Sequence, residues 1–486
     1  MRIIYIDIDT LRADHLGCYG YARSTSPNID RIAARGVRFA RCYASDVPCL
    51  PSRTALFSGR FGTRTGVVSH GGTAAEPFVE GPKRGFFSTR AKSAWPALLK
   101  KCGLYTASIS SFPARHSAYH YCAGFDELRN PGKLGLENAD EIYRLTEEWL
   151  LRNGASDNWF LHVHLWDPHT PYRAPESYGE PFANQPLPAW LTESVRAAHF
   201  AGVGPHSAQE AVGFSTEYPY GAYPRQPRQI ADMAAVRQLI DGYDTGVRYA
   251  DDYVGRMQEL ITRLGVASDT AWMISADHGE TLGELNVYGD HHTADELTAH
   301  VPCILAWPGL TPRVHDALCY PLDVAASVVE LVGGAAPPDW DGRSLAPALL
   351  ASRDEGRSEL VITQGAWTCQ RGVRWGDHLY IRTYHDGYHA YPAELLFDVV
   401  RDPHEQQDLA PAQQELVAQG RQRLAAWHED VMRRSPNGLD PLETVLQEGG
   451  PAHTRGKLRV YLERLRATGR TDWAEQLAQS HPTDLA

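Results

Sequence analysis

The chain has 486 residues, 43% of them hydrophobic, and a formal net charge of −12. This length exceeds what one hydrophobic core usually serves, so two domains are predicted. The negative charge argues against a general nucleic-acid or anionic-membrane binder. No apolar run approaches the length of a membrane span, and a strand-like run starts at Ile3, which leaves no room for a signal peptide. The eight cysteines are scattered without paired spacing, so we expect a reduced, cytoplasmic protein without a nucleic-acid or membrane partner.

The first predicted strand, residues 3–8, ends in acidic residues. Asp7 and Asp9 share one face because side chains alternate along a strand. Ligands of open α/β sheets bind at the carboxyl ends of the strands, and hard cations prefer oxygen ligands. Asp7 and Asp9 are therefore candidate metal ligands, although either carboxylate could instead cap the turn at Thr10.

A predicted capped helix (25–36) and a strand (37–43) lead to the spacing Cys49-x-Pro51-x-Arg53. Helix-like sequence follows directly, so free backbone N–H groups and the positive end of a helix dipole would favour an anion beside Cys49. Taken alone, this spacing could equally mark a small buried cysteine beside a proline turn.

The next segments continue the pattern of a parallel sheet. His70 lies in a glycine-rich stretch after the cysteine motif and is a candidate substrate contact, although a solvent-facing loop histidine would explain it too. Residues 94–102 and 105–110 then predict a helix and a strand in βαβ order.

Another strand is predicted at 159–165, and His162 and His164 within it are predicted to be hydrogen-bonded core histidines. The segment 173–227, rich in Pro, Gly and Tyr, indicates an insertion over the site of the kind that carries specificity.

A second strand end with metal-binding side chains follows a long predicted helix at 230–264. The strand 271–275 leads into Asp277 and His278, a carboxylate and an imidazole. One such pair is a weak signal for a metal site. Two such strand ends that flank a cysteine motif are a strong one.

The pattern changes in the last quarter of the chain. Short strands are predicted at 370–375, 378–384 and 394–398, with helices after them. The sequence therefore predicts an α/β fold with a large, mostly parallel sheet flanked by helices, plus a smaller C-terminal antiparallel sheet packed with helices. We assign residues 1–364 to the first domain and residues 365–486 to the second.

These motifs together resemble the type I sulfatases of the alkaline-phosphatase-like superfamily. The resemblance rests on the cysteine motif, on the acidic opening around Asp9 and on the loop 167–172, and it covers residues 1–410. It implies that the first domain hydrolyses a sulfate ester.

In that family a formylglycine-generating enzyme oxidises the cysteine to an aldehyde whose hydrate carries two hydroxyl groups. The resemblance implies that Cys49 becomes formylglycine, that one hydroxyl attacks sulfur, and that the other lets the aldehyde re-form and expel sulfate. It also implies one divalent metal ion, calcium by resemblance with magnesium or manganese as alternatives. The implied ligands are Asp9, Asp277, His278 and the hydrate, and Arg53 would hold the hydrate.

The sequence departs from the family pattern at two further places. Many members carry a second aspartate where this chain has Thr10, so Asp7 is our candidate for the extra metal ligand. The best-known members place a lysine and a histidine after the strand at 105–110 to hold sulfate. Arg115 and His116 stand there in this chain and are candidate substrate contacts.

Many sulfatases also present a lysine to the sulfate near residue 291, but this chain has no lysine between Lys133 and Lys457. The family register places His291 there, with His292 as the alternative. His291 would supply positive charge only when protonated, because the ordinary histidine pKa is about 6.5. His169, in the loop that faces sulfate in the family, would protonate the departing alcohol.

Two other functions stay open at this point. A phosphonate monoester or phosphodiester hydrolase of the same superfamily uses the same metal loop and formylglycine, and a non-catalytic binding protein would share the fold without turnover. The expected partners are a small sulfated substrate, whether a sugar, aryl or small-metabolite sulfate, and the formylglycine-generating enzyme.

Overall fold

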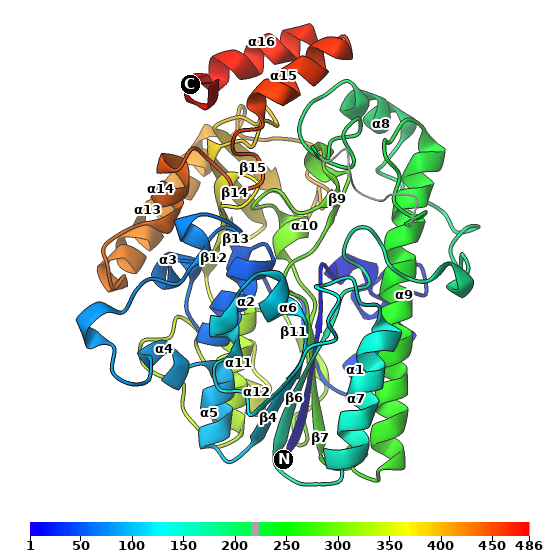
Figure 1. Ribbon diagram of the computed structural model, residues 1–486, viewed down its shortest axis with the longest axis vertical. Helices are drawn as coiled ribbons and strands as arrows, with labels where there is room; N and C mark the ends of the chain where they lie inside the picture. The colour runs from blue at the N-terminus through cyan, green and yellow to red at the C-terminus, as the bar shows by residue number, and fades with distance from the viewer. Residues whose placement is uncertain (215–222, 486) are drawn as a thin grey trace.

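The computed structural model describes residues 1–214 and 223–485, and its larger sheet runs through the centre of the molecule (Figure 1). The strands of this sheet are β1 (Arg2–Ile8), β2 (Val37–Phe39), β4 (Tyr105–Ile109), β5 (Glu127–Arg129), β6 (Trp159–Leu165), β7 (Thr270–Ser275), β10 (Cys303–Ala306) and β11 (Arg313–His315). Their order is β11-β2-β10-β7-β1-β6-β4-β5. β10 runs antiparallel to both of its neighbours, and the other pairs are parallel.

β1 lies inside this sheet, parallel to β6 on one side and to β7 on the other. Every residue of β1 is buried, as expected for a parallel strand with helices over both faces. The register places Asp7 beside His164 of β6 and Ser275 of β7. The carboxyl ends of these three strands therefore meet at one edge of the sheet, which is where the predicted metal ligands lie.

Helices cover both faces of the larger sheet (Figure 1). On one face α7 (Ala139–Asn153) packs against α9 (Met233–Arg263), and on the other α2 (Cys49–Ser58), α5 (Trp95–Lys101) and α11 (Pro321–Leu331) pack together. The long predicted helix is confirmed as α9, which begins after Asp232, whose side chain accepts the backbone N–H of Ala235 (2.8 Å). Shorter helices are α1 (Pro27–Ala33), α3 (Gly62–Thr65), α4 (Thr89–Lys92), α6 (Phe112–Arg115), α10 (Glu296–Ala299) and α12 (Ala346–Leu350).

The smaller sheet joins the C-terminal strands to the cysteine loop. Its strands are β3 (Asp46–Val47), β12 (Glu359–Gln364), β13 (Cys369–Trp375), β14 (His378–His385) and β15 (Glu394–Asp398). The order is β15-β14-β13-β12-β3, antiparallel except for the parallel pair of β12 with β3. A two-stranded ribbon of β8 (Thr281–Leu282) and β9 (Tyr288–Asp290) lies apart from both sheets.

This arrangement bears on the predicted division of the chain. The boundary at residue 364 falls between β12 and β13, which are hydrogen-bonded neighbours, and one buried apolar core extends through both sheets. The strand expected at 37–43 is shorter and ends at Phe39, because the following residues make only isolated bridges to other segments. The division at residues 364 and 365 stays a prediction.

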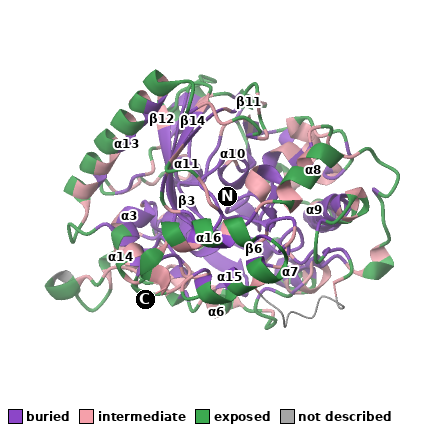
Figure 2. Ribbon diagram, turned by 90° about the horizontal axis from the view of Figure 1, so that it is seen from above, coloured by how far each residue is buried: buried purple, intermediate pink, exposed green. Residues whose placement is uncertain are grey.

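The tail packs against the predicted insertion. Its helices are α13 (Gln414–Arg434), α14 (Pro441–Gln447), α15 (Leu458–Ala467) and α16 (Thr471–Ser480), and the described part of the insertion contains α8 (Glu193–Phe200). Residues 215–222 of the predicted insertion lie outside the described residues. α15 and α16 form a small apolar cluster with Val203 of the insertion and Tyr388. In Figure 2 much of α13 and α16 is coloured as exposed, whereas the strands beside α13 are coloured as buried.

None of the helices in the described part of the chain combines the length and apolarity that a bilayer crossing needs.

A buried ion pair also holds the tail on the insertion. Arg470 Nη1 lies 3.0 Å from Glu210 Oε2, and both side chains are buried. Replacing Arg470 by leucine leaves Glu210 without its charge partner, which costs about 3 kcal/mol for a buried pair. We expect Arg470→Leu to lower the urea midpoint of unfolding. The double variant Glu210→Gln/Arg470→Leu should recover most of that loss, and an equal loss in both variants would contradict the role of the pair.

Asp167 connects the end of β6 to the start of α7. Its Oδ1 accepts the backbone N–H of Ala139, the first residue of α7 (3.0 Å). Its Oδ2 has no hydrogen-bond partner among the described residues, and burial raises the pKa of Asp167 to about 7.

This raised pKa predicts a pH-dependent stability. An unfolded aspartate ionises at about pH 3.9, so between about pH 4 and 7 the native chain binds more protons at this group than the unfolded chain. The contribution of Asp167 to stability therefore falls as the pH rises through that window. We expect Asp167→Asn to flatten this part of the curve of Tm against pH, measured from pH 4 to 8. A slope unchanged from the wild type would show that Asp167 does not cause the dependence.

Candidate active site

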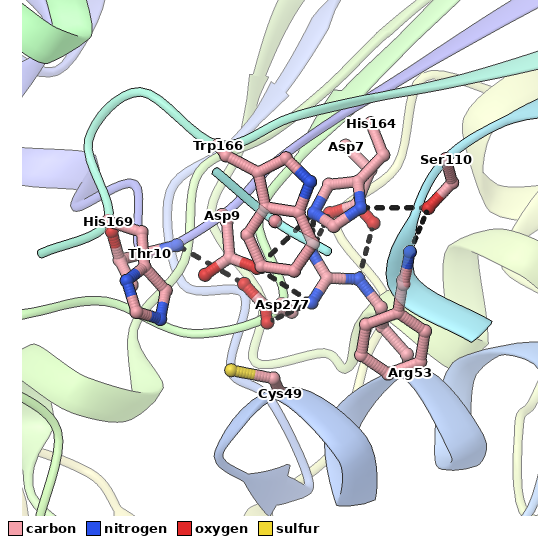
Figure 3. Close-up of polar contacts among 12 residues, drawn as sticks. Asp7, Asp9, Thr10, Cys49, Arg53, Ser110, His164, Trp166, His169 and Asp277 are labelled. Carbon is pink, nitrogen blue, oxygen red and sulfur yellow. Dashed lines mark hydrogen bonds and ion pairs between the residues drawn. The ribbon is translucent and has the colours of Figure 1, made fainter. Parts of the chain in front are cut away.

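Arg53 is fully buried on α2 at the carboxyl edge of the larger sheet (Figure 3). Its Nε and Nη2 donate to Asp7 Oδ2 (2.7 Å) and Oδ1 (3.1 Å). Its Nη1 donates to Asp9 Oδ2 (2.9 Å) and Asp277 Oδ2 (2.5 Å). Its Nη2 also lies 2.7 Å from His164 Nε2. One guanidinium thus joins the ends of β1, β6 and β7.

Three carboxylates face this one guanidinium, so the buried cluster has an excess of negative charge when all three are ionised. Burial raises the pKa of Asp277 to about 6; Arg53 opposes this rise and the Asp9 carboxylate adds to it. Although burial acts to raise the pKa of Asp9 as well, the charge of Arg53 and the proximity of His164 hold it well below its usual range. A divalent cation beside Asp9 and Asp277 would balance the remaining charge.

Four potential ligands have donor atoms within 4.8 Å of one another, namely those of Asp9, Cys49, Asp277 and His278. Cys49 Sγ is 3.1 Å from His278 Nε2. Asp9 Oδ1 is buried and accepts no hydrogen bond from the described residues, which is costly unless a ligand satisfies it. These residues therefore fit a metal ion. Asp7, which the sequence also proposed as a ligand, lies outside this group because both of its oxygens bind Arg53.

Cys49 is the first residue of α2 and is 1% exposed. Burial, together with the carboxylates of Asp9 and Asp277, raises the pKa of its thiol well above the usual range. An unmodified Cys49 would therefore stay protonated near neutral pH and would be a weak nucleophile.

Cys49 opens into a cavity of about 410 Å³ that gathers residues from distant parts of the sequence. The predicted residues that line it with Cys49 are His70, Arg115, His116, His169 and His291. His292 is not among them: it is fully buried behind the wall, where its ring stacks on Trp367 and its Nδ1 lies 2.9 Å from His389 Nε2.

Burial lowers the pKa of each histidine that lines this cavity below the ordinary histidine value. Burial lowers the pKa of His169 to about 3, and burial and the adjacent His278 lower the pKa of His291 well below its usual range. The role of a protonated His291 as the positive charge beside a bound sulfate stays a prediction. Arg115 places a permanent positive charge on the wall, with its guanidinium over the ring of Trp166 (5.2 Å).

His162 and His164 are buried, as expected, and each binds a serine hydroxyl. They also approach the acidic cluster, where His162 Nε2 lies 3.4 Å from Asp7 Oδ2 and His164 Nε2 lies 3.2 Å from Asp9 Oδ2. The sequence placed them in the core but did not indicate these contacts with the site.

Several cavity residues were missed in the sequence. His206 and Gln226 come from the insertion, and His453 comes from the tail. His453 Nε2 lies 2.9 Å from His70 Nδ1, but the family resemblance ended before the tail, so nothing in the sequence placed it here. Asp290 also lines the cavity, and its position directly before His291 was an available signal.

Comparison with known proteins agrees with this geometry. The sulfatase family model matches residues 2–335. The chain is 26% identical to the choline-sulfatase of Rhizobium meliloti (strain 1021), over 79% of this chain and 77% of that protein. It is 26% identical to the N-acetylgalactosamine-6-sulfatase of Sus scrofa, over 92% of each chain.

Solved structures share the fold. One, in complex with its substrate D-glucosamine-2-N,6-O-disulfate, superposes with a TM-score of 0.70 at 19% identity, covering 90% of this chain and 99% of that one. The phosphonate monoester hydrolase of Silicibacter pomeroyi superposes with a TM-score of 0.64 at 20% identity, covering 90% and 96%. The predicted α/β fold is confirmed. Since the family model spans well over half of its residues, the chain belongs to the sulfatase family.

Proposed function

We propose that this chain hydrolyses a small sulfate ester by means of a formylglycine made from Cys49. The observation that carries the proposal is the buried group of Asp9, Cys49, Asp277 and His278 at the inner end of a cavity. Membership of the sulfatase family makes sulfuric ester hydrolysis the activity of the chain. The residues and cofactors assigned below are our own inference.

Asp9, Asp277, His278 and the modified Cys49 would hold one divalent ion, calcium by resemblance with magnesium or manganese as alternatives. Such an ion, when bound, supplies positive charge to the hydroxyl nucleophile and to the sulfate. We assign Asp7 a different task from the one expected from the sequence. Because Asp7 engages Arg53 through both oxygens, it fixes the guanidinium, and Arg53 in turn fixes the metal-binding carboxylates.

His169 is assigned the proton transfer to the departing alcohol. Its Nδ1 contacts the backbone carbonyl of Thr170, so Nδ1 carries the proton of the neutral ring and donates it there. Nε2 is then unprotonated, so it would first take the proton of the attacking hydroxyl of the hydrate and then give that proton to the ester oxygen of the departing alcohol.

The sulfate itself would bind between Arg115 and the cavity histidines. Arg115 supplies charge, whereas His70, His116 and His291 supply hydrogen bonds as neutral rings. His116 Nε2 is buried and has no hydrogen-bond partner among the described residues, so it is available to a ligand. His453 would orient His70 through their hydrogen bond.

A second candidate function is hydrolysis of a phosphonate monoester or a phosphodiester. It is favoured by the phosphonate monoester hydrolase among the structural neighbours, which shows the shared fold alone. Both functions require the same metal group and the same modified cysteine. A formylglycine-generating enzyme would therefore be a partner of this chain in either case.

The first test concerns Cys49. After coexpression with a formylglycine-generating enzyme, we expect the peptide that contains Cys49 to have the mass of the aldehyde in place of that of the thiol. Cys49→Ala should lower kcat/KM for an aryl sulfate by several orders of magnitude, because it removes a covalent nucleophile. Mass spectrometry and steady-state kinetics measure the two effects.

The same preparation separates the alternatives. Activity of Cys49→Ala within about tenfold of the wild type would overturn the nucleophile assignment. A kcat/KM for a phosphodiester above that for an aryl sulfate would favour the second candidate function. Absence of turnover of either ester by oxidised, calcium-loaded protein would indicate a binding protein.

The second test separates Asp7 from the metal ligands. We expect Asp277→Asn to weaken calcium binding by about tenfold or more, because it removes a ligand charge. Asp7→Asn should weaken calcium binding less than Asp277→Asn does, while lowering kcat, because it loosens Arg53 without removing a ligand. Isothermal titration with calcium measures the affinity, and the two substitutions are chemically matched. Equal losses of affinity would make Asp7 a direct ligand.

A further inference from the structure

A second cluster of imidazole and carboxylate groups lies in the wall of the same cavity. His206 Nε2 is 3.2 Å from Asp290 Oδ2, and His292 Nε2 is 3.5 Å from Asp290 Oδ1. One donor atom from each of the three residues lies within 4.8 Å of the others. Asp290 is 5% and His292 0% exposed, so the polar groups of this cluster depend on partners inside the protein.

Neighbouring groups orient two of these side chains. His292 Nδ1 lies 2.9 Å from His389 Nε2, and the backbone N–H of His291 donates to Asp290 Oδ1 (2.8 Å). In metal sites, a ligand histidine typically engages a partner through its second nitrogen, and a ligand carboxylate is itself hydrogen-bonded. The surroundings of His292 and Asp290 have this pattern.

The described residues alone do not close the hydrogen bonds of the cluster. His292 Nε2 and His389 Nδ1 are buried and have no hydrogen-bond partner among the described residues. One proton is shared between the two rings. If His292 donates it, the bare Nε2 of His292 faces the Asp290 carboxylate, lone pair against lone pair. If His389 donates it, Nδ1 of His389 stays bare, and the remaining contact from His292 to Asp290, at 3.5 Å, is too long for a good hydrogen bond.

A metal ion resolves this conflict. With His292 donating to His389, a cation between His292 Nε2 and Asp290 turns two opposed acceptors into two ligands. Tetrahedral zinc has bonds of about 2.0–2.2 Å to nitrogen and oxygen, which places its ligand atoms about 3.4 Å apart. The 3.2 Å from His206 Nε2 to Asp290 Oδ2 is close to that value, and His292 Nε2 lies 3.5 Å from the other oxygen, Oδ1.

We propose that His206, Asp290 and His292 form a second metal site, of the zinc class, separate from the group around Asp9. Two imidazoles and one carboxylate suit zinc or cobalt, whereas calcium prefers oxygen ligands alone. His206 and Asp290 line the cavity, so an ion there has access from solvent and an open coordination position toward the substrate. An oxygen donor on the alcohol part of the substrate would occupy that position.

The site also joins separate parts of the chain. His206 belongs to the insertion, whereas Asp290 ends β9 and His292 follows it. An ion held by all three would fix the insertion against the rest of the cavity wall. The proposal concerns metal binding and is independent of the ester that the chain hydrolyses.

Zinc titration of calcium-loaded protein tests the proposal. Calcium occupies the group around Asp9, so we expect one zinc ion per chain to bind in addition to calcium, measured by isothermal titration and elemental analysis. His206→Asn should weaken zinc binding by about 100-fold, and His389→Gln by about tenfold through the orientation of His292. Asparagine is chosen at 206 because it tolerates the positive φ of that residue (56°).

A matched control separates the site from the insertion as a whole. His199 is a partly buried histidine of α8 in the same insertion, where it contacts the Tyr288 hydroxyl outside the cluster (2.7 Å). His199→Asn should keep the zinc affinity of the wild type. Zinc that only replaces calcium, with one metal ion per chain in total, would overturn the proposal. Unchanged zinc affinity in folded His206→Asn and Asp290→Asn would overturn it too.

Discussion

The buried guanidinium of Arg53 is the interaction on which the site depends. An isolated charge in the interior is costly, and three carboxylates from the ends of β1 and β7 make this one tolerable. Arg53 and Cys49 lie four residues apart on α2, on the same face of the helix. The ion pairs that hold Arg53 therefore also set the position of Cys49 relative to Asp9 and Asp277. Any change that frees Arg53 should therefore disturb the proposed nucleophile and the proposed metal-binding group together.

The chemistry and the cavity come from different parts of the fold. The larger sheet supplies the acidic strand ends. The smaller sheet supplies the segment that leads into Cys49, because its strand β3 pairs with β12 and ends at Val47. The cavity wall adds the insertion, through His206, and the tail, through His453. A fold of this kind can keep one reaction centre while separate segments change the substrate. The packing of α15 and α16 against the insertion joins the tail and the insertion into one unit.

The sequence predicted the parts of the fold whose signals are local. The buried strands β1, β6 and β7 and the amphipathic helix α9 follow from composition and periodicity. Alternation along β1 put Asp7 and Asp9 on one face, but only the structure shows that Arg53 binds both oxygens of Asp7 and one oxygen of Asp9. The other oxygen of Asp9 has no partner among the described residues. The contact of His70 with His453 spans 383 residues, and no periodicity encodes such a distance.

The charge of the cavity narrows the substrates that it can accept. Burial lowers the pKa of His70, His116, His169 and His291 below the ordinary histidine value, so these rings offer hydrogen bonds without charge. A phosphate monoester carries a charge of about −2 near pH 7, whereas a sulfate monoester or a phosphodiester carries a single negative charge. Apart from the proposed metal ion, Arg115 is the permanent cation among the described residues of the wall, and one such charge suits a singly charged ester. The net charge therefore does not distinguish a sulfate monoester from a phosphodiester. The part of the cavity that binds the alcohol must provide the selectivity between them.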